Sequence, residues 1–155
     1  PFRYRDYNLF HQINIDPFVR KFMWDDEIIP LDTAKEIMQE NESHFEKDSF
    51  GIWKVILKET DELIGYTGLW YFFNEQQPQL IYALLKQYTK QGYAIESSKA
   101  IIEYCFNTLG FTYLIAATDE PHLESQKVAK ELGMKFHEKR IEDDKPTLFF
   151  KIEKW

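Results

Sequence analysis

The sequence predicts an α/β fold, a single domain in which a central mixed, mostly antiparallel sheet carries helices on both faces. Three observations support this. The chain has 155 residues, the length of one domain, and no Gly/Ser/Pro-rich linker divides residues 1–155. The spacing of apolar residues changes along the chain, from helical to alternating and back. The middle of the chain places a helix between two strands, an order typical of a parallel crossover.

Two helices are expected in the first third of the chain. The first is Asp6–Ile15, with Asp6 as a candidate N-cap, and Asp16-Pro17 breaks it. The second is Leu31–Ser49, which is rich in Glu and can be capped by Asp32 or Thr33. Its apolar residues recur at roughly helical spacing, at Ala34, Ile37, Met38 and Phe45.

Three strands follow, because β-branched and aromatic residues replace the helical pattern. Phe50–Lys58 and Leu63–Phe73 flank a four-residue acidic turn, which predicts an antiparallel hairpin. A second turn at 74–78 leads into Gln79–Leu85. The segment from residue 50 to residue 85 is therefore expected to be a three-stranded meander.

The second half begins with the longest apolar stripe of helical period. Ala94–Leu109 carries this stripe, and Gly110 stands where a helix C-cap is expected. Phe111–Ala117 is short, continuously apolar and β-prone, as in a buried strand. Because a strand, a helix and a strand follow one another, Phe111–Ala117 is expected to lie parallel to Gln79–Leu85.

One more helix and two strands complete the expected fold. Pro121–Leu132 has helical character and is closed by Gly133. Met134–Ile141 and Thr147–Ile152 are expected as strands on either side of a charged turn at 142–146. The predicted order is α-α-β-β-β-α-β-α-β-β.

Composition excludes several classes of protein. The single cysteine excludes a disulfide framework and a multi-cysteine metal site, so no metal is expected. It also indicates a reducing compartment, and we expect a cytoplasmic location. The formal charge of −7 disfavours nucleic acid and favours cationic ligands, including amines. No apolar run reaches the length of a membrane span, so no membrane partner is expected.

The junction between the third strand and the long helix is the segment most indicative of chemistry. It reads Gln87-Tyr88-Thr89-Lys90-Gln91-Gly92-Tyr93-Ala94. The first N–H groups of a helix lack partners, and with the helix dipole they form an anion site suited to a pyrophosphate. Small residues at 92 and 94 would let phosphate oxygens approach the backbone, and Lys90 and Gln91 could add donors. Taken alone, the segment is equally compatible with an ordinary turn.

These residues also resemble the signature of the GNAT superfamily of acetyl-CoA-dependent N-acetyltransferases, Gln/Arg-x-x-Gly-x-Gly/Ala. Gln87, Lys90 and Gly92 fall on its three fixed places. The continuation Gly92-Tyr93-Ala94-x-Glu96 is similar to the branch that includes the ribosomal-protein N-terminal acetyltransferases. Glu62–Leu69 resembles the family's Ile-Gly-x-x-Gly hairpin strand. The segments 118–125 and 131–134 resemble its Asn-x-x-Ser helix and the terminal Leu-Gly-Phe/Met.

The resemblance covers about residues 50–140 and has three departures from the family pattern. Lys90 stands where the family prefers Gly, His122 replaces the usual Asn, and Val128 lies where many members carry a Tyr that protonates the leaving thiolate. The family's first strand normally precedes a segment like residues 1–6. The resemblance therefore implies one N-acetyltransferase domain over 1–155 whose first strand would precede residue 1.

Acetyl-CoA is the co-substrate that the resemblance implies, bound where the parallel strands splay near Leu84. The cofactor-binding residues carried over are Leu84, Leu85, Lys86, Gln87, Lys90, Gln91, Gly92, Tyr93, Ala94, His122 and Ser125. Ser125 and Tyr82 are the candidate catalytic residues. Ser125 is either a hydrogen-bond donor to the sulfur or a first-turn serine bonded to backbone. Tyr82 points either to the acceptor or into the core.

The leading hypothesis is an N-acetyltransferase that acts by direct attack of a primary amine, on a protein N-terminus or a small amine. The alternative is a GNAT-fold binding module with weakened catalysis. A monomer or homodimer is compatible with either. Asp119 and Glu120 could hold a cationic amine or simply be solvated. Five aromatic residues either face the acceptor or are ordinary core: Trp24, Tyr66, Trp70, Tyr71 and Tyr82.

Overall fold

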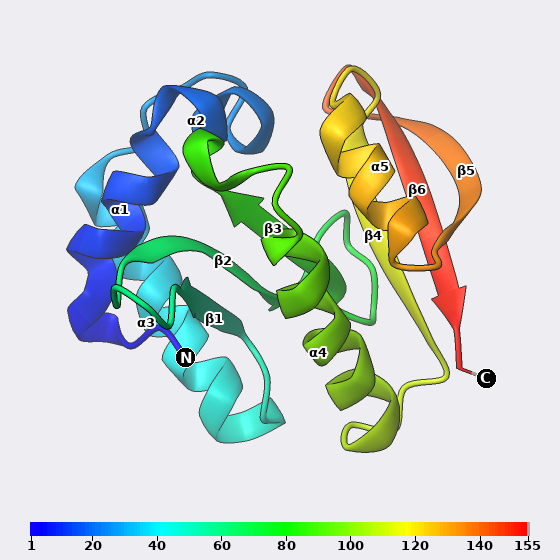
Figure 1. Cartoon of the computed structure of the whole chain (residues 1–155), viewed down its shortest axis with the longest axis horizontal. Helices are drawn as coiled ribbons and strands as arrows, with labels where there is room; N and C mark the ends of the chain where they lie inside the picture. The colour runs from blue at the N-terminus through cyan, green and yellow to red at the C-terminus, as the bar shows by residue number, and fades with distance from the viewer. Residues whose placement is uncertain (155) are drawn as a thin grey trace.

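The first half of the molecule is a three-stranded sheet with helices packed against it. The computed structural model describes residues 1–154. The strands β1 (Ile52–Ile56), β2 (Leu63–Trp70) and β3 (Gln79–Leu84) pair antiparallel in that order, which confirms the predicted meander. Figure 1 shows this sheet on the side of the molecule that also carries the N-terminus.

Three α-helices precede this sheet in the chain, and a fourth follows it directly. A short 3-10 turn, η1 (Tyr4–Asp6), leads into α1 (Tyr7–Ile15), which is followed by α2 (Pro17–Met23) and α3 (Leu31–Asp48). After β3, a second 3-10 turn, η2 (Lys86–Tyr88), leads into α4 (Tyr93–Asn107). The predicted helices over 6–15, 31–49 and 94–109 are confirmed to within a few residues. None of the helices in residues 1–154 combines the length and apolarity needed to cross a membrane.

A second sheet forms from the rest of the chain. β4 (Tyr113–Asp119), β5 (Lys135–Glu142) and β6 (Lys145–Glu153) pair antiparallel in the order β4-β6-β5, and α5 (Leu123–Glu131) lies between β4 and β5 in the chain. The tight turn from β5 to β6 uses Asp143 and Asp144, both with positive φ (51° and 63°). This backbone suits the twist of a two-residue hairpin.

The prediction of one central mixed sheet is wrong in its pairing. Among residues 1–154 the strands form two separate sheets, each antiparallel, and β4 pairs with β6 rather than with β3. The edge strands β3 and β4 nevertheless pack against each other. The β4–β6 ladder joins seven residue pairs from Tyr113↔Glu153 to Asp119↔Thr147, so β4 has a complete partner without β3.

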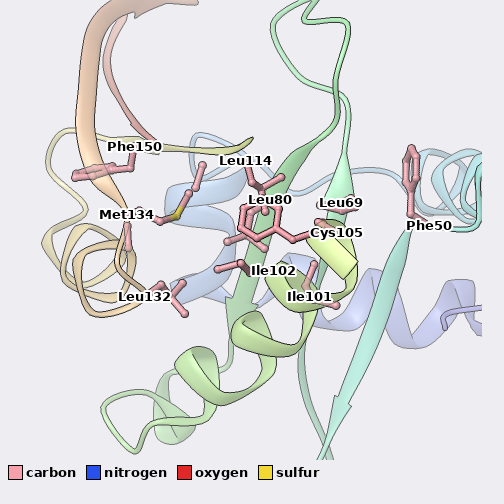
Figure 2. Close-up of a cluster of buried hydrophobic side chains, with 13 residues drawn as sticks. Phe50, Leu69, Leu80, Ile101, Ile102, Cys105, Leu114, Leu132, Met134 and Phe150 are labelled. Carbon is pink, nitrogen blue, oxygen red and sulfur yellow. The ribbon is translucent and has the colours of Figure 1, made fainter. Parts of the chain in front are cut away.

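Helices cover both faces of the first sheet, as predicted. Leu80 packs in a core cluster with α4, whereas its neighbour Ile81 packs in a second cluster with α1 and α3, because adjacent strand residues face opposite sides. Figure 2 shows Ile101, Ile102 and Cys105 of α4 gathered beside Leu80 and Leu114. The α4 cluster therefore joins the two sheets through side chains.

Gly68, the second glycine of the hairpin motif, is required because β2 lies very close to the backbone at the start of β1. A Cβ added at Gly68 would lie 2.1 Å from the Gly51 carbonyl oxygen and 2.8 Å from the Ile52 Cα. No side chain fits there without moving β1. The Ile-Gly-x-x-Gly pattern is thus a packing requirement of the sheet that supports β3.

Candidate active site

Tyr82 and Ser125 form a hydrogen-bonded pair that joins the two halves of the molecule. The Tyr82 hydroxyl donates to the Ser125 carbonyl oxygen at 2.9 Å, and the Ser125 Oγ donates to the Tyr82 Oη at 3.3 Å. Tyr82 lies near the end of β3, and Ser125 lies in the first turn of α5. Ser125, in the first turn of α5, therefore bonds a side chain across the site, and its role toward the sulfur stays a prediction.

The protonation of this pair is fixed by its environment. Burial raises the pKa of Tyr82 to about 12, and the hydrogen bond with Ser125 lowers it less. The phenol is therefore neutral near pH 7 and acts as a donor. Its own proton is already given to the Ser125 carbonyl, so the Ser125 hydroxyl is the more readily redirected of the two donors.

His122 stands beside this pair as the N-cap of α5 and stacks on Phe22 of α2. The ring centroids are 3.7 Å apart and the planes differ by 8°. Burial, with the nearby Lys21 charge, lowers the pKa of His122 to about 4. At neutral pH the ring is uncharged, so it presents one donor and one acceptor nitrogen.

A cavity of about 280 Å³ lies between α2, the end of β3, the start of α4 and one face of α5. We call it the α4–α5 cavity. It is lined by Phe18, Val19, Phe22, Met23, Tyr82, Ala83, Leu84, Thr89, Lys90, Gly92, Ala94, Ile95, His122, Glu124, Ser125, Lys127, Val128 and Glu131. It is a predominantly apolar slot with a polar end at residues 89–92, where η2 leads into α4.

The polar end of the α4–α5 cavity has an open backbone. Gly92 has a φ of +87°, and a Cβ added there would meet no atom within 4 Å. The first bond of α4 runs from the Glu96 N–H to the Gly92 carbonyl at 2.9 Å, so the N–H groups of residues 93–95 have no acceptor within the helix. Lys90 has a φ of 62°, the left-handed conformation in which the family signature has Gly.

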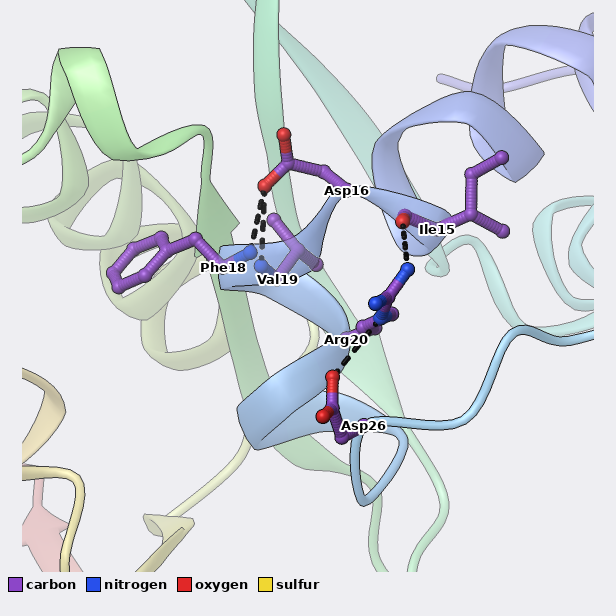
Figure 3. Close-up of polar contacts among 6 residues, drawn as sticks. All are labelled: Ile15, Asp16, Phe18, Val19, Arg20 and Asp26. Carbon is purple, nitrogen blue, oxygen red and sulfur yellow. Dashed lines mark hydrogen bonds and ion pairs between the residues drawn. The ribbon is translucent and has the colours of Figure 1, made fainter.

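Helix α2 forms the wall of the slot that sequence reasoning missed. Asp16 caps it, accepting from Phe18 N at 3.0 Å and from Val19 N at 3.3 Å (Figure 3). Pro17 stands in the first turn. Asp followed by Pro is a helix-start signal, because Pro has no N–H to leave unpaired at that position. The sequence interpretation treated Asp16-Pro17 only as a break.

Some of the predicted cofactor residues line the slot and some do not. Leu84, Lys90, Gly92, Ala94, His122 and Ser125 line the α4–α5 cavity, together with Tyr82. The remaining ones lie in the same turn or in the first residue of α4 but outside the lining: Leu85, Lys86, Gln87, Gln91 and Tyr93. Val128, noted in the sequence as a departure, also lines the slot.

A second cavity of about 400 Å³ opens on the other side of the Tyr82–Ser125 pair. We call it the acidic cavity. It is enclosed by residues 22–27, the loop after β2, β3, the end of β4 and the β5–β6 turn. Two cavities with a common boundary thus meet at one place, and the residues that line both are Phe22, Met23, Tyr82, His122 and Ser125.

Of the five aromatic residues proposed for an acceptor cleft, two line the acidic cavity and three line neither cavity. Trp24 and Tyr82 line the acidic cavity. Tyr66 is core, 1% exposed, with its hydroxyl donating to Asn14 Oδ1 at 2.7 Å. Trp70 and Tyr71 line neither cavity and contact His44 instead.

The two acidic candidates at the end of β4, Asp119 and Glu120, lie in different surroundings. Asp119 lines the acidic cavity, while Glu120 pairs with Lys139 at 2.7 Å and lines neither cavity. The loop after β2 adds Phe72 and Phe73, which sequence reasoning did not select.

The sequence matches the family described as acetyltransferase (GNAT) domain over residues 1–135. This covers most of the chain, and the fold and the slot beside α4 agree with it. The chain belongs to the GNAT acetyltransferases and is an acetyl-CoA-dependent N-acetyltransferase. Between the enzyme and the binding module, the enzyme is therefore the correct reading.

Individual relatives agree with this assignment. The chain is 26% identical over 134 residues to the uncharacterized N-acetyltransferase YnaD of Bacillus subtilis, covering 86% of this chain and 76% of that protein. A GnaT-family acetyltransferase structure from Bordetella pertussis superposes with a TM-score of 0.84 at 15% identity, covering 97% of this chain and 92% of that one. A ribosomal-protein-serine acetyltransferase structure from Vibrio cholerae, itself a provisional assignment, gives 0.72 at 18% identity, covering 97% and 90%.

Proposed function

We propose that the chain transfers the acetyl group of acetyl-CoA to a primary amine by direct attack at the Tyr82–Ser125 pair. The observation that carries the proposal is the meeting of the α4–α5 cavity and the acidic cavity at this pair. A transferase of this kind needs two separate entrances to one reaction centre. One entrance admits the thioester and the other admits the amine.

The α4–α5 cavity is the proposed site of acetyl-CoA. Its polar end offers the N–H groups of residues 93–95, which have no acceptor within α4, and a Cβ placed at Gly92 would meet no atom of residues 1–154 within 4 Å. Together with the helix dipole, these donors suit a pyrophosphate. Lys90 lines the same end and would add a positive charge. The apolar remainder of the slot suits the pantetheine arm and the acetyl group.

The proposed contact for pantetheine is the edge of β3 that β2 does not use. β3 is the last strand of its sheet, and β4, the edge of the other sheet, packs beside it without a ladder among residues 1–154. An extended ligand can pair with such an edge like an added strand. We infer that β3 and β4 are the splayed pair of the family, and that a free N–H near Leu84 binds the developing oxyanion.

In the proposed reaction the amine nitrogen forms a bond to the thioester carbonyl carbon. The carbonyl electron pair moves to oxygen, and collapse of the tetrahedral species breaks the C–S bond and expels the thiolate. The amine proton is lost to water. The Ser125 hydroxyl turns from Tyr82, donates a hydrogen bond to the thiolate sulfur and keeps its own proton, while the Tyr82 hydroxyl holds the Ser125 carbonyl in place. Positioning supplies a large share of the rate.

Binding of the co-substrate is the first test. Gly92→Val puts a branched side chain beside the proposed phosphate site and is expected to weaken CoA binding by about tenfold or more, measured by isothermal titration calorimetry. Gly110→Val is the matched control, because Gly110 also has a positive φ (+77°) and an open Cβ direction, at the other end of α4. Equal CoA affinity in both variants refutes the phosphate site.

Turnover is the second test, followed as free thiol released from acetyl-CoA in the presence of a primary amine. Ser125→Ala is expected to lower kcat by about 10- to 100-fold while CoA affinity changes little, since the hydroxyl acts on the leaving sulfur. A kcat equal to that of the parent removes Ser125 from the mechanism.

A further inference from the structure

The acidic cavity differs in the charge of its lining residues from the α4–α5 cavity. Five carboxylates line it, against a single lysine: Asp25, Glu27, Asp119, Glu142 and Asp143 oppose Lys145. The α4–α5 cavity, in contrast, is lined by Lys90, Lys127, Glu124 and Glu131, which balance. His122 lies between the two cavities and is uncharged near neutral pH, so it does not offset the carboxylates.

The cavity already accommodates one ammonium group. Lys145 Nζ contacts Asp25 Oδ1 and lies 3.2 Å from Asp119 Oδ2. This contact neutralises two of the carboxylates in part. Glu27, Glu142 and Asp143 remain without a cation inside the cavity, although Glu142 also lies 3.6 Å from the Arg140 Nε.

Two buried residues of the cavity lining, Gln79 and Thr118, which we call the floor, carry polar atoms that have no hydrogen-bond partner among residues 1–154. Gln79 is 2% exposed and Thr118 is 8% exposed, and both line the acidic cavity. Gln79 also lines a smaller cavity of about 180 Å³ beside Arg140, whereas Thr118 lines the acidic cavity and not that one. The Gln79 Oε1 and Nε2 and the Thr118 Oγ1 have no hydrogen-bond partner among residues 1–154. Buried polar groups are almost always satisfied by protein or ordered water, so these atoms are open to hydrogen bonds from water or from a ligand in the cavity.

We propose that the acidic cavity binds the acceptor, and that the acceptor is a small aliphatic amine with two or more amino groups. The inference rests on the proposed acetyl transfer at Tyr82–Ser125. One nitrogen of the acceptor reacts at this pair, and a second, charged nitrogen binds the carboxylates and the floor. The aromatic walls at Trp24, Phe72 and Phe73 contact the methylene groups between the nitrogens.

Two nitrogens are needed because the two tasks demand opposite charge states. The reacting amine must be neutral to attack, and the uncharged, partly buried surroundings of Tyr82, Ser125 and His122 lower its pKa by desolvation. The carboxylates do the reverse and hold a neighbouring nitrogen as ammonium. A monoamine placed at the carboxylates would be charged and unreactive, and one placed at the pair would leave the carboxylates unused.

Direct binding tests the inference without acetyl transfer. Spermidine, a triamine, is titrated into the full chain by calorimetry and compared with n-heptylamine and alanine amide, which have one amino group each. Spermidine is expected to bind at least about tenfold more tightly, with an affinity that falls as NaCl is raised. Equal affinity of the three amines overturns the inference.

Variants of the lining residues test whether spermidine binds in the acidic cavity. The double variant Asp119→Asn with Glu142→Gln is expected to weaken spermidine binding about tenfold. The matched control, Glu59→Gln with Asp61→Asn in the exposed turn between β1 and β2, keeps the parent affinity. Gln79→Leu is expected to keep or raise the melting temperature, because it removes an unpaired buried amide, yet to weaken spermidine binding. Parent-like affinity in Gln79→Leu and in the double variant overturns the inference.

Thiol release separates the two proposals. Release with spermidine and little with alanine amide supports both. Release with alanine amide but not with spermidine overturns the polyamine inference and leaves the proposed function intact. Absence of CoA binding overturns the proposed function, and the spermidine titration still decides whether the acidic cavity holds a polycation.

Discussion

At the scale of single residues, Lys90 occupies a backbone conformation that suits it poorly. Its φ of 62° lies in the left-handed region, which a side chain disfavours and glycine does not. Because the side chain is exposed and lines the polar end of the α4–α5 cavity, its charge offers a compensating benefit at the proposed phosphate site. Two substitutions at position 90 separate the effect of backbone strain on stability from the effect of the lysine charge on CoA binding.

Lys90→Gly is expected to raise the free energy of unfolding by about 1 kcal/mol relative to Lys90→Ala, since only glycine relieves the strain. Both variants lose the ammonium and are expected to bind CoA about threefold more weakly. Urea denaturation and calorimetry measure the two effects. If Lys90→Gly and Lys90→Ala have equal free energies of unfolding, the backbone at position 90 is not strained, contrary to what its positive φ indicates.

His122 gives the fold a pH dependence of predictable sign. Its folded pKa, about 4, lies below the ordinary value of 6.5, so the unfolded chain binds more protons between these values. Stability is therefore complete above pH 6.5 and is lost as the pH falls toward 4. Partial contact of the ring with water reduces the loss, which we expect to be about 1 to 2 kcal/mol.

The variant His122→Asn, which restores the family's residue, removes this contribution. The stability difference between variant and parent is expected to grow in the variant's favour as the pH falls from 6.5 to 4, measured by urea denaturation at each pH. His137→Asn, at an exposed position on β5, serves as control. A parent-to-variant difference that stays constant with pH would show that the His122 pKa is not depressed.

At the scale of elements, α2 depends on its cap. It has seven residues, too few to be stable alone, and it is held by Asp16 at its start and by packing of Val19, 3% exposed, in the second core cluster. Arg20 ties it to its surroundings, donating to the Ile15 carbonyl at 3.2 Å and to Asp26 at 2.9 Å (Figure 3).

Asp16→Ala is expected to lower the free energy of unfolding by about 1 kcal/mol and to weaken CoA binding, because α2 forms one wall of the slot. Asp16→Asn keeps a good N-cap side chain and is expected to retain most of both properties. Thermal unfolding and calorimetry give the two readouts. If Asp16→Asn loses as much stability and CoA affinity as Asp16→Ala, the negative charge of Asp16 matters rather than its hydrogen bonds to the N-terminus of α2.

Elements with a strong local signal were predictable, and those that depend on distant partners were not. The meander and α4 follow from alternation and from a long apolar stripe, both legible within one segment. Helix α2 was missed because seven residues carry little periodicity. The division into two sheets was missed because β4 pairs with β6, about 35 residues later, and no local pattern specifies that choice.

The same limit applied to the site. The turn at 87–94 was found from sequence because its residues are contiguous. Tyr82 and Ser125 were selected separately, but their pairing spans 43 residues and appears only in the fold. The acidic cavity could not be predicted from the sequence, because its carboxylates come from three distant segments: the one after α2, the end of β4 and the β5–β6 turn.

At the scale of the whole molecule, one core cluster packs against both sheets, which share no ladder among residues 1–154. That cluster takes Leu69 and Leu80 from the first sheet, Leu114 and Phe150 from the second, and Ile102 from α4 (Figure 2). The proposed reaction centre lies between the same two halves, because Tyr82 belongs to β3 and Ser125 to α5. The alignment of the two candidate catalytic residues therefore depends on side-chain packing rather than on a hydrogen-bonded sheet.

Ile102→Ala tests whether the halves unfold together. Ile102 is 3% exposed, so truncation is expected to lower the free energy of unfolding by about 2 to 5 kcal/mol. If the cluster couples the sheets, the slowest amides of β2 and β6 lose the same protection in hydrogen exchange. Ile141→Ala, at a position that is 66% exposed on β5, is the control and should change stability by less than about 0.5 kcal/mol. Loss of protection in one sheet alone would show that the halves are separate cooperative units.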